Sequence, residues 1–245
     1  MKTAKYQKRF YRDYHRCTDL FKLQLVFKET DLQILADRPL NKNFCENRVR
    51  FYRRNIESYI LRDPRFAVAL KPLVVELSAS MVVKKMCRAS RIAGVGPMAA
   101  VAGAIAQFLG KDLLKMGYKE VIVENGGDIF LKITKPRLIG MYAGKSRIFN
   151  RLSLEILPDD TPLGICTSSG TLGHSLSFGR ADAVVILARD AALADTVATA
   201  TANRIQSQKD LEKALAFARS IRGVSGVVII LKKHLISWGK VRFKS

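Results

Sequence analysis

The segment that most restricts how this chain can fold is an uncharged stretch from Ile92 to Gly110. Its length is close to the roughly 18 residues that a membrane-spanning helix requires. However, it is rich in alanine and glycine, it contains Pro97, and no second stretch of this kind occurs in the chain. Low hydrophobicity and an internal proline predict instead a buried helix that follows a glycine-rich turn. We therefore expect no membrane span.

The composition indicates a globular protein with an anionic partner. The chain has 245 residues, of which 48% are hydrophobic, so it can bury a sizeable core and is not disordered or of low complexity. Its formal net charge of +21 favours a nucleic acid, a membrane surface or a phosphorylated small molecule. No apolar leader and no C-x-x-C motif occur, which predicts reduced thiols and a cytoplasmic location. The cysteines are Cys17, Cys45, Cys87 and Cys166.

Hydrophobic periodicity predicts an α+β fold in which a mainly antiparallel sheet packs with helices. We expect a single domain over residues 1–245, with residues 1–75 as a basic hairpin–helix extension of it; two pseudo-related halves are a further option. The predicted hairpin spans 20–36, with its turn at Glu29–Asp31. The predicted helices are 43–61, 76–92, 97–116, 190–206 and 209–222, and the predicted strands are 121–124, 129–134, 138–142, 152–156, 163–167, 183–187, 224–231 and 235–244.

A glycine pair joins two of these strands at Asn125-Gly126-Gly127-Asp128. A Gly-Gly turn is also what an ordinary hairpin prefers. Glycines equally let bare backbone approach a flat or phosphorylated ligand. Both interpretations remain open, as does the role of Glu124 and Asp128, which either bind ligand hydroxyls or order the turn.

Asp195 and Thr199 are four residues apart in a predicted helix and therefore point from one face of it. A carboxylate and a hydroxyl together suit a hard cation such as Mg²⁺. The alternative is local, because an Asp near the start of a helix complements the helix dipole.

Two glycine- and hydroxyl-rich segments offer further candidate sites. Gly94-x-Gly96-x-x-Ala99 has the spacing of a dinucleotide fingerprint, but a predicted helix precedes it where that motif requires a strand. Two interpretations of this segment remain open: its small residues allow close packing, or the helix N-terminus binds a phosphate. Residues 166–175 contain Ser168, Ser169 and His174, which fit a hydroxyl-rich ligand loop better than a Ser–His nucleophile.

Basic residues gather in three places, the N-terminal arm, the 43–61 helix and the tail. Aromatic side chains lie between those of the arm, a mixture that suits single-stranded nucleic acid. A solvated basic surface is the alternative interpretation. The residues are Lys8, Arg9, Arg12 and Arg16; Arg48, Arg50, Arg53 and Arg54; and Lys232, Lys233, Lys240, Arg242 and Lys244.

The order of these motifs over roughly residues 75–205 resembles the ApbE-like superfamily, whose best-known members are FAD:protein FMN transferases. The matching elements are the Gly-Gly-Asp-Ile turn after an apolar strand, a Ser-Gly pair, a further apolar strand and an A-D-x-x-A-T-A helix. The resemblance implies that Asp195 and Thr199, with a backbone carbonyl, hold Mg²⁺. It further implies that a flavin nucleotide, FAD or FMN, is bound by Asn125, Gly126, Gly127, Asp128, Ser169 and Gly170.

The chain also departs from the transferases. Their D-P-x-T-G motif is missing, and Ala102-Gly103 stands where they have a lysine–glycine pair. The opening, with R-F-Y-R at 9–12 and E-T-D-L at 29–32, more closely resembles a separate, uncharacterised prokaryotic branch of the superfamily. The resemblance implies Mg²⁺-dependent binding of a flavin nucleotide or related phosphorylated ligand, and nucleotidyl or FMN transfer with Asp195 and His174 as catalytic residues. The alternatives are a nucleic-acid-binding protein that keeps the fold without the chemistry, and a hydrolase. A homodimer is compatible with each.

Overall fold

The fold is built on one large antiparallel sheet. The computed structural model describes residues 17–141, 149, 152–169 and 179–244. The large sheet has eight strands in the order β1-β2-β3-β4-β7-β8-β9-β10, and each pairs antiparallel with its neighbours. Its strands are β1 (Phe21–Phe27), β2 (Thr30–Ala36), β3 (Val121–Asn125), β4 (Asp128–Lys132), β7 (Leu163–Ser168), β8 (Ala183–Ala188), β9 (Val224–Leu231) and β10 (His234–Gly239).

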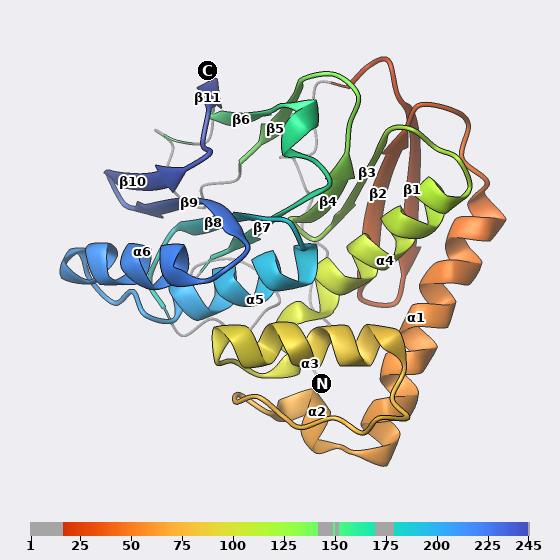
Figure 1. Ribbon diagram of the computed structural model, residues 1–245, viewed down its shortest axis with the longest axis horizontal. Helices are drawn as coiled ribbons and strands as arrows, with labels where there is room; N and C mark the ends of the chain where they lie inside the picture. Colours follow the sequence, from red (N-terminus) through yellow and green to blue (C-terminus); the bar gives the residue numbers. More distant parts are fainter. Residues whose placement is uncertain (1–16, 142–148, 150–151, 170–178, 245) are drawn as a thin grey trace.

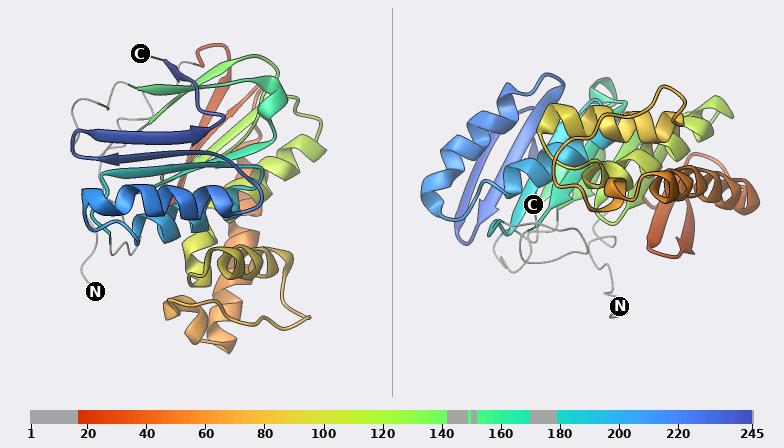
Figure 2. Two further views of the ribbon diagram at one scale, coloured as in Figure 1. Left: turned by 60° about the vertical axis from the view of Figure 1, so that its left-hand side comes forward. Right: turned by 90° about the horizontal axis from the view of Figure 1, so that it is seen from below.

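Both faces of the large sheet are covered (Figures 1 and 2). Helices α4, α5 and α6 pack on one face, and a three-stranded sheet in the order β11-β6-β5 packs on the other. Helices α1, α2 and α3 form an outer cluster against α4. This arrangement confirms the predicted α+β class. The helices are α1 (Lys42–Arg62), α2 (Arg65–Val68), α3 (Met81–Ala93), α4 (Val101–Lys115), α5 (Ala191–Ala202) and α6 (Leu211–Ser220), and the small sheet has β5 (Arg137–Gly140), β6 (Ser153–Ile156) and β11 (Phe243–Lys244).

Alternation along the strands distributes side chains between two cores. In β3, Val121 and Val123 contact the helices, whereas Ile122 contacts the small sheet. Successive side chains of a strand point to opposite faces, so a sheet covered on both sides needs apolar residues at every position. This explains why β8 is buried along its whole length.

The uncharged stretch lies inside the protein, as predicted. Pro97 begins a 3₁₀ turn, Pro97–Ala100, and α4 follows directly. Within the described residues, no single helix is both long and apolar enough to cross a membrane; α3 and the 97–115 segment pass that test only as a pair, which is bent by 106°. The small residues of this stretch let α4 approach α5, because a Cβ on Gly103 would lie 2.4 Å from the carbonyl oxygen of Ala191.

The hairpin turn is one place where the prediction was wrong. The turn is formed by Lys28 and Glu29, with Lys28 at φ +53°, and not by residues 29–31. Thr30 and Asp31 belong to β2 and are buried. A two-residue turn with positive φ matches the twist of the flanking strands. The turn therefore uses only the first two residues of the polar run 28–31, and the other two belong to β2.

Several predicted boundaries also differ from the structure. The helix predicted to begin at residue 76 begins at Met81, because residues 77–79 form a turn before it. The last predicted strand is divided: β10 pairs with β9, whereas β11 crosses to the small sheet and pairs with β6. Helix 190–206 ends at residue 202, helix 209–222 is reduced to 211–220 after a 3₁₀ turn, and strand 138–142 is 137–140 as far as the described residues reach.

A buried ion pair ties the small sheet to the large one. Arg137 begins β5, and its Nε donates to Glu120 at 2.5 Å, next to the start of β3. Both side chains are at most 4% exposed. The guanidinium also donates to both carboxylate oxygens of Asp19, at 2.5 and 2.9 Å. Removing one partner of such a pair leaves an uncompensated buried charge.

We predict that Arg137→Met lowers the free energy of unfolding by about 3–5 kcal/mol, because Glu120 is then buried without its main partner. Adding Glu120→Gln should recover part of this loss. Arg242→Met is the control: Arg242 is half-exposed in its pair with Asp160, and its loss should cost less than about 1 kcal/mol. Urea denaturation measures all three variants. A double variant no more stable than Arg137→Met would contradict the prediction.

Candidate functional site

The Gly-Gly segment is the tight turn between β3 and β4. Gly126 and Gly127 have φ angles of +69° and +101°, which side chains other than glycine rarely adopt. Glu124 orders this turn, because its Oε1 accepts a hydrogen bond from the Gly127 amide at 2.7 Å. A Cβ on Gly127 would meet nothing within 4 Å. The turn therefore needs glycine for its backbone geometry, and it also presents bare backbone to open space.

Asn125 and Asp128 face each other across the end of this hairpin. Both are buried and lie on the face of the sheet that the helices cover. The side-chain amide of Asn125 donates to the carbonyl oxygen of Ala102 at 3.2 Å, which links the hairpin to the first turn of α4. Asn125 therefore positions the turn against α4.

Asp195 projects from α5 toward the same turn of α4. Its Oδ2 accepts a hydrogen bond from the Gly103 amide at 2.9 Å. The first amides of a helix lack partners within it, so this carboxylate caps α4. Thr199 lies one turn further along α5 and is buried. Asp195 thus has a structural role that the sequence did not predict, because its side chain caps a neighbouring helix.

The structure brings together the carboxylates of Asp128 and Asp195. Burial, then the charge of Asp195, raise the pKa of Asp128 well above its usual value, although a hydrogen bond with the Cys166 thiol lowers it. Burial raises the pKa of Asp195 to about 7, against the lowering effect of the Gly103 and Ala102 amides. No lysine or arginine of the described residues forms an ion pair with either carboxylate. The site therefore consists of two buried carboxyls for which the described residues provide no basic partner.

Sequence reasoning missed Gln107, which sets the position of α5. Its Oε1 accepts from the Ala191 amide at 2.8 Å, and the residue is buried in α4. Cys166 of β7 contacts the same residue, since its Sγ donates to the Ala191 carbonyl at 3.3 Å. A signal was available, because Gln107 is the one residue with a polar side chain between Ile92 and Gly110.

Part of the predicted site lies outside the described residues. Ser169 follows directly after β7, whereas Gly170 and His174 belong to the segment that the structure does not describe. Within the described residues, no three His, Cys, Asp or Glu side chains are arranged to hold a metal. A cation at Asp195 would therefore also need oxygens of other kinds, such as the Thr199 hydroxyl and backbone carbonyls.

Many of the predicted basic residues are engaged within the protein. Arg48 pairs with Asp112, and Arg53 with Glu29 and Glu57. In the tail, Lys240 and Arg242 pair with Asp160, and Lys244 with Glu155. The residues of the N-terminal arm, up to Arg16, lie outside the described part. Ion pairing reduces the free positive charge that a nucleic acid would contact.

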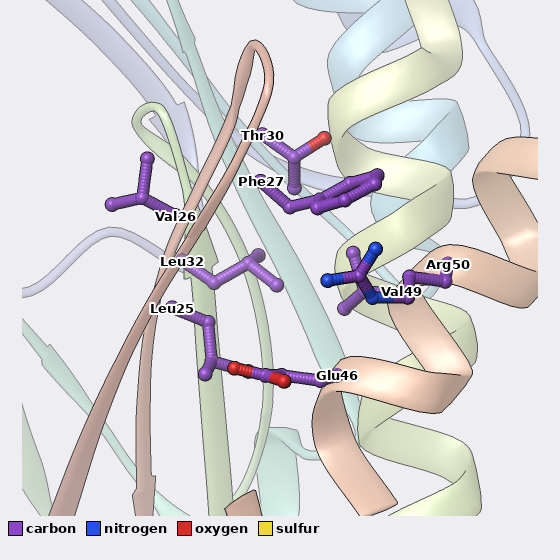
Figure 3. Close-up of a pocket in the computed structure, with 8 residues that line it drawn as sticks. All are labelled: Leu25, Val26, Phe27, Thr30, Leu32, Glu46, Val49 and Arg50. Carbon is purple, nitrogen blue, oxygen red and sulfur yellow. The ribbon is translucent and has the colours of Figure 1, made fainter. Parts of the chain in front are cut away.

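Two pockets of the described residues lie away from the carboxylate pair. One lies between the β1–β2 hairpin and α1, where the Arg50 guanidinium lies 4.1 Å from the centre of the Phe27 ring (Figure 3). The other lies near the starts of β7 and β9. The first is lined by Leu25, Val26, Phe27, Thr30, Leu32, Glu46, Val49 and Arg50; the second by Ile156, Asp159, Asp160, Leu163, Leu187, Arg189, Gly223, Val224, Ser225 and Lys240.

We predict that Asp195→Asn stabilises the metal-free protein at high pH. A carboxyl whose pKa rises on folding makes stability fall as the pH increases from its unfolded value, near 4, through about 7. The variant lacks this fall, so its free energy of unfolding should exceed that of the wild type by about 1–3 kcal/mol at pH 8 and by little at pH 4.

Urea denaturation with a chelator at the two pH values measures this difference. Asp159→Asn serves as the control, because Asp159 is exposed and no hydrogen bond or ion pair of its side chain is found among the described residues. An Asp195→Asn difference that is the same at both pH values would contradict the prediction.

Comparisons with known proteins agree with the resemblance seen in the motifs. A family model described as AbpE bacteria matches residues 12–242. The UPF0280 protein of Methanosarcina acetivorans is 40% identical, over 87% of this chain and 85% of its own length. The UPF0280 protein of Methanococcus aeolicus is 39% identical, over 89% and 90%.

Solved structures show the same fold. The apo flavinyl transferase ApbE of Pseudomonas stutzeri has a TM-score of 0.61 at 14% identity, covering 90% of this chain and 94% of that one. The ApbE protein of Thermotoga maritima has a TM-score of 0.61 at 13% identity, covering 91% and 96%. With the relatives at about 40% identity and a family model over nearly the whole chain, this protein belongs to the family described as AbpE bacteria, within the ApbE-like superfamily.

Proposed function

We propose that this protein binds a flavin nucleotide, FAD or FMN, together with Mg²⁺, and that it transfers the FMN or nucleotidyl part to an acceptor. The observation that supports this most is the pair of Asp128 and Asp195 carboxylates without a basic partner among the described residues, next to the bare backbone of Gly126 and Gly127. Family membership gives the flavin its priority over other phosphorylated ligands.

The donor set fits a hard divalent cation. Asp195 supplies a carboxylate in which Oδ2 is already held by the Gly103 amide, so the orientation of the carboxylate is fixed before any ligand arrives. Thr199 supplies a hydroxyl from the same helix, one turn away. Oxygen ligands of this kind are those that Mg²⁺ prefers. When bound, the cation would neutralise charge that develops on a pyrophosphate.

The β3–β4 turn would orient the ligand. Its glycines leave open space beside Gly127, so a phosphate or a flat ring can approach the backbone. Asn125 is held by Ala102 and fixes the turn against α4. Asp128 lies at the base of the turn, where its carboxyl would form a hydrogen bond with a hydroxyl or ring nitrogen of the ligand. We assign Ser169 and Gly170 to the same ligand.

In the transfer, an acceptor hydroxyl oxygen attacks the phosphorus on the flavin side of the pyrophosphate. A new P–O bond forms, the P–O bond to the other nucleotide breaks, and the leaving phosphate takes that electron pair. The acceptor loses its proton, and we assign His174 as the group that removes it. Asp195 would contribute by holding the cation that stabilises the charge of the phosphates.

We further propose that residues 1–245 act as one domain, with residues 1–75 as its N-terminal extension. The β1–β2 hairpin supports this, because β2 pairs directly with β3 in the large sheet. A cytoplasmic location is supported by four free cysteines, all of them buried.

We predict that FAD with Mg²⁺ raises the melting temperature by more than either does alone, because each ligand would favour binding of the other to the folded protein. Asp195→Ala and Thr199→Val should remove the Mg²⁺-dependent part of this rise. Thr196→Val is the matched control on the same helix, since the Thr196 hydroxyl is buried and donates to helix carbonyls, that of Leu193 among them. It should keep the Mg²⁺ dependence.

Differential scanning fluorimetry with FAD, FMN and each nucleotide without Mg²⁺ makes this measurement. No shift with any flavin nucleotide plus Mg²⁺, or an unchanged shift in Asp195→Ala, would overturn the proposed function. Release of AMP from FAD by the wild type, measured by chromatography, distinguishes transfer or hydrolysis from binding alone.

A further inference from the structure

One end of the protein exposes apolar side chains to an unusual extent. We call this surface the apolar tip. It extends from the end of α1 through α2 and the segment that leads to α3, which lies at the lower edge of the molecule in Figure 1 and in the left view of Figure 2. Val74 is 97% exposed and Leu77 is 93% exposed. The tip consists of Leu61, Val68, Leu70, Val74, Leu77 and Met81, all exposed.

Buried side chains hold the backbone of the tip in place. Leu73 and Val75 point inward and pack against the helical core, so the alternation of an extended chain directs Val74 outward. Ala79 is buried, and its amide donates to the Glu76 carbonyl at 3.1 Å, which closes the turn that presents Leu77. The exposure of these side chains is therefore imposed by packed neighbours. Clustered apolar exposure of this kind marks an interaction surface.

The surroundings of the tip are strongly basic. Residues 61–92 contain seven lysines and arginines and two acidic residues. Both acidic side chains have partners: Asp63 forms an ion pair with Arg65, and Glu76 accepts a hydrogen bond from the Ser78 hydroxyl. Among the described residues, five of the basic side chains form no ion pair: Arg62, Lys71, Lys84, Arg88 and Arg91. A partner of this surface should thus combine apolar groups with negative charge.

We propose that the apolar tip inserts into the interfacial region of an anionic lipid bilayer, with the surrounding lysines and arginines on the headgroups. Acyl chains supply an apolar environment, and anionic headgroups attract basic residues near the surface. Such docking leaves the chain on the membrane and is distinct from a span.

Two other occupants fit the observations less well. A side chain that is more than nine-tenths exposed projects beyond its neighbours and cannot line a groove, and neither pocket includes a residue of the tip. A protein partner would have to supply the whole concave surface, whereas a bilayer needs no matching shape. A second copy of this chain would bring the same basic residues against this face, and like charges repel.

Vesicle co-sedimentation of the full chain tests the proposal. Vesicles of phosphatidylcholine with phosphatidylglycerol should bind the wild type at least about tenfold more tightly than vesicles of phosphatidylcholine alone, because the headgroup charge is part of the site. Val74→Ser/Leu77→Ser should weaken binding to the anionic vesicles by about tenfold, because the inserted groups become polar. Lys71→Gln/Arg88→Gln should also weaken it.

Phe21→Ser/Val26→Ser is the matched control, since these apolar residues are also exposed but lie on β1. Its binding should stay within about twofold of the wild type, because it keeps the tip and its basic surroundings. Melting temperatures show that the variants are folded. The proposal is overturned if the wild type does not sediment with anionic vesicles, or if the control loses as much binding as Val74→Ser/Leu77→Ser. It is also overturned if sedimentation velocity shows a wild-type dimer that Val74→Ser/Leu77→Ser dissociates, because a second copy then covers the tip.

Discussion

The close contact between α4 and α5 is the constraint on which the rest of the structure depends. The backbones approach so closely that a Cβ on Gly103 would lie 2.4 Å from the Ala191 carbonyl oxygen. Gln107 then reaches the Ala191 amide from α4, and Asp195 reaches the Gly103 amide from α5. Each helix thus satisfies a terminal amide of the other. Larger residues at these positions would separate the helices and remove both hydrogen bonds.

This contact also creates the candidate site. Because α5 lies against the first turn of α4, Asp195 is carried to the end of the β3–β4 hairpin, close to Asp128. Burial raises the pKa values of both carboxyls, and the charge of Asp195 raises that of Asp128 further, which opposes folding above the unfolded pKa. Such a pair lowers stability at neutral pH. A cation bound at these carboxyls, as the proposed function requires, would remove this cost.

The two exposed features of the molecule fall in different parts of the fold. The bare turn at Gly126 and Gly127 belongs to the central sheet, where packing on both faces holds it rigidly. The apolar tip belongs to the outer helical cluster, where Phe66 and Ala79 are buried but the residues between them reach solvent. Binding of a ligand and docking to a surface would therefore use separate elements of one chain.

The sequence by itself determined the class of fold, the glycine turn between β3 and β4, and the start of the α5 helix. These depend on local patterns: period-two alternation in the strands, a glycine pair between them, and Asp190, which caps α5 by accepting from the Leu193 amide. The predicted boundaries of helices and strands differ from the observed ones where tertiary pairing competes with local propensity. Residues 76–80 look helical but form a turn before α3, and the last predicted strand divides between two sheets.

Only the tertiary structure decided what Asp195 contacts. Its four-residue spacing from Thr199 predicts a shared helix face, but the Gly103 amide and the Asp128 carboxyl are 92 and 67 positions away along the chain. The same holds for Gln107, which no motif singled out although it caps α5. Local periodicity specifies which face of a helix is apolar, whereas the partner of that face depends on how distant elements pack. The candidate site is therefore a property of the α4–α5 contact, and no single motif contains it.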